Sequence, residues 1–216
     1  MRSLLTAATI SLAFTLFLTP LFIRLFEKLG WGQVIRTPEN AHNPNHQAKR
    51  GTPTMGGVIF IIGSIVGYLV GTLTGGAPPS ISGLLVIWMM VGLGAVGFID
   101  DYLKVRQQRS LGLSGWRKVV GQVLVAVPFG IVALNFPNRV AQTPASPYIS
   151  FFRDIPMLSF LALGAIIGSI AYLVWISFLS VAWSNATNLT DGLDGLATGA
   201  GIFTISAYSL VTFWQF

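Results

Sequence analysis

The sequence predicts an all-α fold, a polytopic transmembrane helical bundle with about six spans. Hydrophobic residues make up 53% of the 216 residues and charged residues only 9%, which leaves too little polar surface for a water-soluble globule. Six uncharged apolar stretches each come close to the roughly 20 residues that a helix needs to cross a bilayer. These stretches are residues 4–23, 55–76, 81–99, 119–136, 157–183 and 196–216.

Each stretch is expected to be helical, because a chain in lipid must satisfy its backbone N–H and C=O groups internally, and a β-barrel would show alternating segments of ~10 residues. The first stretch could be mistaken for a signal peptide, but it is long and no small-residue cleavage pattern follows it. In the second stretch Gly63, Gly67 and Gly71 recur every four residues, and Gly164 and Gly168 repeat this spacing further on. Small residues at this interval indicate close helix packing.

The basic residues predict the orientation of the bundle. Ten of the thirteen lysines and arginines lie between the first and second stretches or between the third and fourth. The positive-inside rule therefore places the connections at about 24–54 and 100–118 in the cytoplasm, together with the connection at 184–195. The N-terminus and the segment 137–156, which is expected to form a small hairpin, then lie outside. We expect a single integral membrane domain over residues 1–216.

The acidic residues gather on the same predicted face. Of the seven, only Asp154 falls outside, although acidic residues contribute little to orientation and topology does not require this clustering. The absence of cysteine excludes disulfides and thiolate metal sites. The cations flank the spans and form no mixed basic and aromatic patch, so the net charge of +6 does not indicate nucleic-acid binding. The acids therefore predict a polar site at the cytoplasmic surface.

Asp100 and Asp101 directly follow the third apolar stretch. They fall at the C-terminal end of the predicted helix, where the helix dipole disfavours negative charge, so capping does not explain them. We expect this pair to bind a cation or to take up a proton. The alternative is a solvated loop in which Lys104 and Arg106 are the partners of the two carboxylates.

A polar side chain recurs at every third position after the fifth stretch, at Asn185, Asn188, Asp191 and Asp194. Steps of three drift around a helix, so the four are not expected to share one face, and neighbouring glycines are expected to let the backbone turn around a ligand. Carboxylate and amide oxygens are the hard ligands that Mg²⁺ prefers, commonly together with substrate phosphates. The alternative is that Asp191 or Asp194 caps the sixth helix.

A third motif, KRGTPTMGG at 49–57, precedes the second span. The free N–H groups of a helix N-terminus, the helix dipole and Lys49 would together bind a pyrophosphate, with glycines that allow close approach. The alternative is a plain helix start, with Thr52 as the N-cap and Pro53 in the first helical position. His42 and His46 are separated by Asn-Pro-Asn, which argues against a helix that presents both to zinc.

The three motifs together resemble the bacterial phospho-N-acetylmuramoyl-pentapeptide transferases, a branch of the polyprenyl-phosphate N-acetylhexosamine-1-phosphate transferases. The motifs are KRGTPTMGG at 49–57, GFIDDYLKV at 97–105 and NATNLTDGLDGLA at 185–197. The resemblance implies transfer of phospho-MurNAc-pentapeptide from a UDP carrier to undecaprenyl phosphate. The products would be lipid I and UMP, the cofactor Mg²⁺, and the process peptidoglycan synthesis.

The resemblance also implies roles for individual residues. The implied catalytic residues are Asp100, Asp101 and Asp191. The implied substrate-binding residues are Lys49, Thr54, Asn185, Asn188 and Asp194. The implied metal ligands are Asp101 and Asp191. Asp100 would activate the prenyl phosphate and Asp101 would be its electrostatic or metal partner, which suits phosphoryl transfer because that reaction needs charge neutralisation and placement more than covalent help.

The family pattern extends beyond this sequence. Its members carry further spans, a later metal-ligand aspartate and a His-rich motif, none of which is present before Phe216. We therefore expect the chain to be the N-terminal part of a larger transferase, with activity that needs the remainder. The expected location is the bacterial inner (plasma) membrane, multi-pass, with the active face in the cytoplasm.

Two alternatives to this function are a sister transferase that uses UDP-N-acetylglucosamine and, from a different class, a membrane transporter. A transporter is expected to carry ionisable groups near mid-membrane, whereas all six stretches here are uncharged. The implied partners are undecaprenyl phosphate, UDP-MurNAc-pentapeptide and membrane lipid. No nucleic-acid partner is expected, and a homodimer is compatible with the resemblance.

Overall fold

The computed structural model describes residues 2–32, 53–76, 78–108, 111–138, 141–150, 154–191 and 195–215. Its helices are α1 (Arg2–Lys28), α2 (Gly57–Thr74), α3 (Ile81–Gln107), α4 (Gly115–Asn135), α5 (Ala165–Thr190) and α6 (Leu196–Gln215). All six are long and apolar enough to cross a membrane. The prediction of an all-α, polytopic bundle is confirmed.

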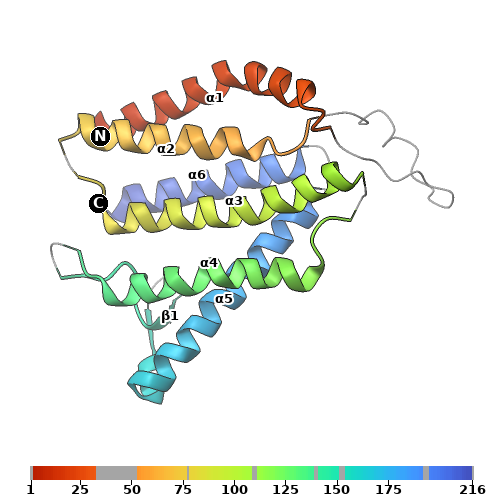
Figure 1. Ribbon diagram of the computed structural model, residues 1–216. Helices are drawn as coiled ribbons and strands as arrows, with labels where there is room; N and C mark the ends of the chain where they lie inside the picture. The colour runs from red at the N-terminus through yellow and green to blue at the C-terminus, as the bar shows by residue number, and fades with distance from the viewer. Residues whose placement is uncertain are drawn as a thin grey trace.

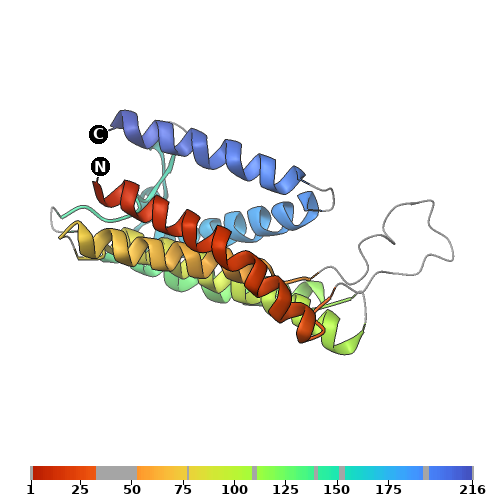
Figure 2. The ribbon, with the colours of Figure 1, turned by 90° about the horizontal axis from the view of Figure 1, so that it is seen from above.

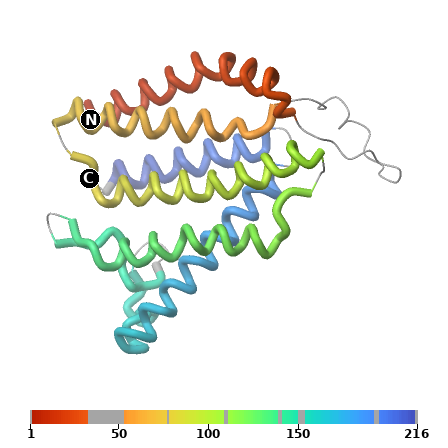
Figure 3. The backbone as a smooth tube through the Cα atoms, in the orientation of Figure 1, coloured from red at the N-terminus to blue at the C-terminus, as the bar shows by residue number. Residues whose placement is uncertain are grey.

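The first four helices lie side by side, and α5 crosses them obliquely (Figure 1). The chain reverses at each end of the bundle, so the same end carries the C-terminal ends of α1, α3 and α5 and the N-terminal ends of α2, α4 and α6 (Figure 3). Although α6 overlaps α3 in Figure 1, the view from above shows that it stands apart, next to α5 (Figure 2). None of the described side chains of α6 is buried.

The glycine repeat of α2 forms the contact with α1, as its spacing predicted. A Cβ atom added at Gly67 would lie 2.6 Å from the backbone oxygen of Ala7, and one added at Gly71 would lie 2.6 Å from the Cβ atom of Ala7. Gly63, Gly67 and Gly71 are buried. The two helices approach this closely because three successive turns of α2 carry no side chain on this face.

The fifth helix begins later than the predicted span at 157–183. Strand β2 (Asp154–Ser159) pairs in antiparallel fashion with β1 (Tyr148–Ser150), and a 3-10 turn (Phe160–Leu163) precedes α5. Gly164 has a φ angle of 86°, which glycine adopts readily, so the chain turns there before the helix begins. Gly164 therefore forms a turn rather than the packing contact that its spacing predicted. The hairpin expected on this side is present, but it extends into the apolar stretch.

Two helices extend beyond their apolar stretches at the other end of the bundle. α3 continues to Gln107 and α5 to Thr190, so the connections are shorter than the expected 100–118 and 184–195. α3 ends where Gln108 adopts a left-handed conformation and its N–H group bonds to the last turn. These helical extensions carry four of the predicted site residues, Asp100, Asp101, Asn185 and Asn188.

The α1–α2 contact can be tested with a single added methyl group. Gly67→Ala is expected to lower the free energy of unfolding by about 1–3 kcal/mol, because its Cβ would overlap the α1 backbone. Gly201→Ala in α6 is the matched control, since nothing lies within 4 Å of a Cβ there. Thermal unfolding in detergent measures both variants, and equal unfolding temperatures would contradict the packing role.

Candidate active site

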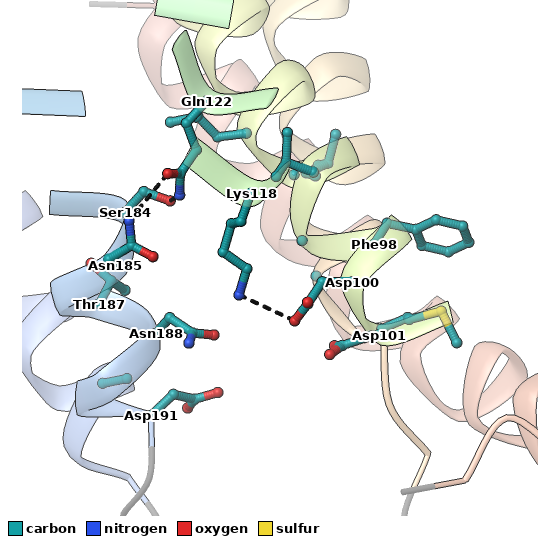
Figure 4. Close-up of a pocket in the computed structure, with 18 of the residues that line it drawn as sticks. Phe98, Asp100, Asp101, Lys118, Gln122, Ser184, Asn185, Thr187, Asn188 and Asp191 are labelled. Carbon is teal, nitrogen blue, oxygen red and sulfur yellow. Dashed lines mark hydrogen bonds and ion pairs between the residues drawn. The ribbon is translucent and has the colours of Figure 1, made fainter. Parts of the chain in front are cut away.

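Residues from five helices line a cavity of about 520 Å³ at the end of the bundle where α3 ends and α4 begins. Figure 4 shows the carboxylates of α3 on one side, the amides of α5 on the other, and Lys118 and Gln122 of α4 between them. The cavity therefore brings together two of the sequence motifs, and the start of α2 adds residues of the third, Met55 and Gly57.

Asp100 is a buried carboxylate with three partners. Its Oδ2 atom lies 2.8 Å from Lys104 Nζ and 3.2 Å from Lys118 Nζ, and the backbone N–H group of Leu113 donates to Oδ1 at 2.8 Å. Only 4% of the residue is exposed. Because a buried carboxylate is costly unless it is paired and hydrogen-bonded, these contacts hold α3, the segment before α4 and α4 itself together.

Asp101 is more accessible and connects α3 to the segment before α2. Lys104 Nζ lies 2.8 Å from its Oδ1 atom, and the hydroxyl group of Thr54 donates to Oδ2 at 3.1 Å. Its side chain is 35% exposed. Lys104 thus pairs with both carboxylates, as the alternative interpretation of this motif predicted, but Asp100 is buried on a helix rather than solvated in a loop.

An aromatic cluster holds Thr54 in place. The backbone N–H group of Thr54 donates to the backbone oxygen of Trp31 at 3.0 Å. The Trp31 ring packs against Phe26 of α1 and against Phe98 and Tyr102 of α3. These contacts fix the chain on either side of the residues that the structure does not describe, and so they place the Thr54 hydroxyl group beside α3.

The start of α2 differs from the plain helix start that was the alternative for this motif. α2 begins at Gly57, and Pro53 lies outside it in a bridge with Gly32. Buried Met55 has a φ angle of 66°, a left-handed conformation that interrupts any helix begun at Pro53. The first turn of α2 borders the cavity instead. Lys49 lies outside the described residues.

Asn185, Asn188 and Asp191 line the cavity from the C-terminal end of α5, so the first three members of the series face the same cavity, and the expectation that all four do not share one face stays a prediction. A step of three residues turns a helix by about 60°, and three such positions therefore span only about a third of its circumference. Asp191 is the C-cap of α5 rather than a cap of α6. Asp194 lies outside the described residues.

The two residues that α4 contributes to the cavity were not among the predicted site residues. Lys118 was interpreted only as a topology signal, and Gln122 received no role, yet both line the cavity one helical turn apart on α4. Gln122 Nε2 donates to Ser184 Oγ at 2.9 Å, and Asn185 Nδ2 donates to Gln122 Oε1 at 3.1 Å. The available signal was a glutamine inside an otherwise apolar stretch, four residues after a lysine.

The oxygen atoms of this cavity suit a hard cation such as Mg²⁺. Asp101 and Asp191 supply carboxylates, and Asn188 supplies an amide oxygen. Among the described residues, no three or more His, Asp or Glu side chains are grouped so as to hold a metal ion. The described residues would therefore supply only part of a Mg²⁺ coordination shell, which is the usual situation where substrate phosphates provide other ligands.

Comparisons with known proteins show which family the sequence resembles. Residues 83–215 match glycosyl transferase family 4, and residues 49–61 match the phospho-N-acetylmuramoyl-pentapeptide-transferase signature 1. Over its whole length the chain is 54% identical to the phospho-N-acetylmuramoyl-pentapeptide-transferase of Clavibacter michiganensis and 47% identical to that of Beutenbergia cavernae. It spans 59% of the length of each of these relatives.

Gly112 allows the segment before α4 to reach Asp100, and its substitution tests this contact. A Cβ atom at Gly112 would lie 2.5 Å from the backbone oxygen of Asp100. Gly112→Ala is expected to displace the Leu113 N–H group and to lower the free energy of unfolding by about 1–3 kcal/mol. Gly115→Ala, where nothing lies within 4 Å of a Cβ, is the control for thermal unfolding. The same unfolding temperature in both variants would show that the segment is not held by Asp100.

Proposed function

The chain belongs to glycosyl transferase family 4, and from this membership we propose that it serves transfer of phospho-N-acetylmuramoyl-pentapeptide from a UDP carrier to undecaprenyl phosphate. The products are lipid I and UMP. The observation that carries the proposal is the cavity, which joins residues from all three motifs that the resemblance rests on. The signature match at 49–61 favours this reaction over a sister transferase that uses UDP-N-acetylglucosamine.

The proposed location is the bacterial inner membrane, with the cavity open to the cytoplasm. Six helices long and apolar enough to span a membrane support a multi-pass protein. Six of the described basic residues lie on the helix segments at the end of the bundle that carries the cavity, and the positive-inside rule assigns such an end to the cytoplasm. They are Arg24, Lys28, Lys104, Arg106, Arg117 and Lys118. Both proposed substrates are then within reach: the soluble nucleotide from the cytoplasm and the prenyl phosphate from the bilayer.

Lys118 is the group on α4 that would receive a substrate phosphate. It borders the cavity, its side chain is 18% exposed, and its ammonium group already pairs with Asp100. A phosphate carries up to two negative charges near neutral pH, so it would draw Lys118 away from the carboxylate. Lys104 would stay paired with Asp100 and with Asp101, so one of the two negative charges on α3 remains balanced.

The proposed role of Asp100 in activating the prenyl phosphate follows from this exchange. Its Oδ2 atom accepts from two lysines, and the departure of Lys118 leaves one acceptor position open. A carboxylate at that position can take the proton of a phosphate monoester, which makes the phosphate oxygen a better nucleophile. Leu113 holds the other oxygen throughout.

The remaining proposed roles lie along the other walls of the cavity. Asp101 and Asp191 would hold Mg²⁺, which when bound supplies charge neutralisation to the diphosphate. Asn185 and Asn188 would contact the nucleotide-sugar from α5, and Thr54 would lie near the diphosphate beside the first turn of α2. Roles for Lys49 and Asp194 at the same substrate are proposed from the motifs alone.

A transfer assay in detergent tests the function. Undecaprenyl phosphate, UDP-MurNAc-pentapeptide and Mg²⁺ are incubated with this chain and, in parallel, with the chain extended by the C-terminal part of the full-length Clavibacter michiganensis relative. We expect the extended chain to form lipid I and UMP in equal amounts and only when Mg²⁺ is present, and this chain alone to form little or none. Use of UDP-N-acetylglucosamine in place of UDP-MurNAc-pentapeptide would replace the proposed substrate with that of the sister transferases.

Asp191→Asn, made in the extended chain, tests the site within the same assay. It is expected to lower the transfer rate by about 10²–10³-fold, because an amide cannot neutralise the metal at the diphosphate. Asp191 is exposed at the end of α5, so the unfolding temperature should hardly change. Asp154→Asn, in the hairpin at the other end of the bundle, is the matched control and should retain the full transfer rate. Normal turnover by Asp191→Asn would remove this residue from the site.

A further inference from the structure

A buried polar contact joins α4 to α5 at the wall of the cavity. Gln122 is only 2% exposed, and both ends of its carboxamide group are engaged. Nε2 donates to Ser184 Oγ at 2.9 Å and Oε1 accepts from Asn185 Nδ2 at 3.1 Å (Figure 4). A buried amide is tolerated when its donors and acceptors are satisfied in this way.

A backbone group sets the direction of this chain of hydrogen bonds. Asn185 Nδ2 donates to the backbone oxygen of Val181 at 2.8 Å as well as to Gln122. A carbonyl oxygen can only accept, so the NH₂ end of the Asn185 carboxamide must face Val181. Gln122 must then present its oxygen to Asn185 and its NH₂ end to Ser184, because the opposite orientation would set two donors against each other.

These hydrogen bonds leave the side-chain oxygen of Asn185 available to the cavity. Both N–H donors of its carboxamide are used within the protein, by Val181 and by Gln122. The oxygen atom Oδ1 is the group left to meet a ligand, and Asn185 lines the cavity. The α5 wall at this point is therefore a hydrogen-bond acceptor, whereas Lys118 across the cavity is a cation.

We infer that Gln122 is a positioning residue that, together with the backbone oxygen of Val181, holds the Asn185 carboxamide with its oxygen toward the cavity, so that Asn185 binds an electron-poor group. That group is either an N–H or O–H donor of a nucleotide or a divalent cation, and a phosphate would be rejected at this point. The inference rests on the proposed function for the identity of the ligand, but the orientation of Asn185 does not depend on that function.

Without Gln122, one N–H donor of Asn185 loses its acceptor and would turn toward the cavity or toward water. Gln122→Met removes the acceptor while keeping a side chain of similar length in the span. Gln122→Asn keeps an amide in the span but is one methylene too short for the same contact, and it serves if the methionine variant does not fold. Asn135→Met, at the other end of α4, is the matched control because its amide bonds within its own helix.

The test follows the side-chain amide signal of Asn185 by ¹⁵N NMR on the chain in detergent, with Asn185→Asp to assign it. Both amide protons of the native chain should exchange slowly, and one of them should exchange at least about tenfold faster in Gln122→Met. Two probes then identify the ligand. A change of the Asn185 signal with Mn²⁺ alone would show that Asn185 binds a divalent cation. A change with UDP alone would show that it binds a hydrogen-bond donor of a nucleotide.

At least one probe is expected to perturb the Asn185 signal in the native chain and in Asn135→Met. The concentration of that probe at half-saturation should be about tenfold higher in Gln122→Met. Unchanged amide exchange and unchanged half-saturation in both Gln122 variants would overturn the inference, as would a signal that neither probe affects. Because no turnover is measured, failure of the transfer assay and failure of this inference are separate outcomes.

Discussion

The polar end of this bundle depends on the buried carboxylate of Asp100. Its three partners come from α3, from the segment after α3 and from α4. One carboxylate therefore holds these three parts of the chain together. Removing one member of such a cluster leaves a charge without its partner in a poorly solvated place, which is more costly than the loss of an exposed ion pair. Asp101, the next residue, extends the arrangement to Thr54 and hence to the start of α2.

The same arrangement explains why the cavity has walls of different character. Two carboxylates and two lysines nearly cancel in charge where α3 meets α4, and of the two lysines it is Lys118 that borders the cavity. α5 contributes amides and an exposed carboxylate instead. A ligand that carries both phosphates and hydrogen-bond donors matches this division, since phosphates pair with ammonium groups and donors pair with amide oxygens. A nucleotide-linked sugar has both.

Much of the fold followed from the sequence because lipid leaves few choices for an apolar chain. The six helices, close packing at the glycine repeat of α2 and the gathering of acids at one end were predicted from residue patterns, whereas the structure identifies α1 as the partner of that repeat. The patterns misplaced the helix ends in two situations. One is an apolar segment that is not helical, as before Gly164, and the other is a helix that continues through polar residues, as at Asp100. They also missed Lys118 and Gln122, because α4 has the composition of an ordinary span with a basic start, and only its packing against α5 shows which of its faces borders the cavity.

Asp100 and Lys118 stabilise each other across the junction of α3 and α4, and a double-mutant cycle measures this coupling. Unfolding free energies in detergent would be compared for the native chain, Asp100→Asn, Lys118→Met and the double variant. We expect the double variant to lose less stability than the sum of the two single losses, with a coupling energy on the order of 1 kcal/mol, as for residues in one ion-pair network. Losses that simply add would show that the two groups act independently and that Asp100 does not hold α4 through Lys118.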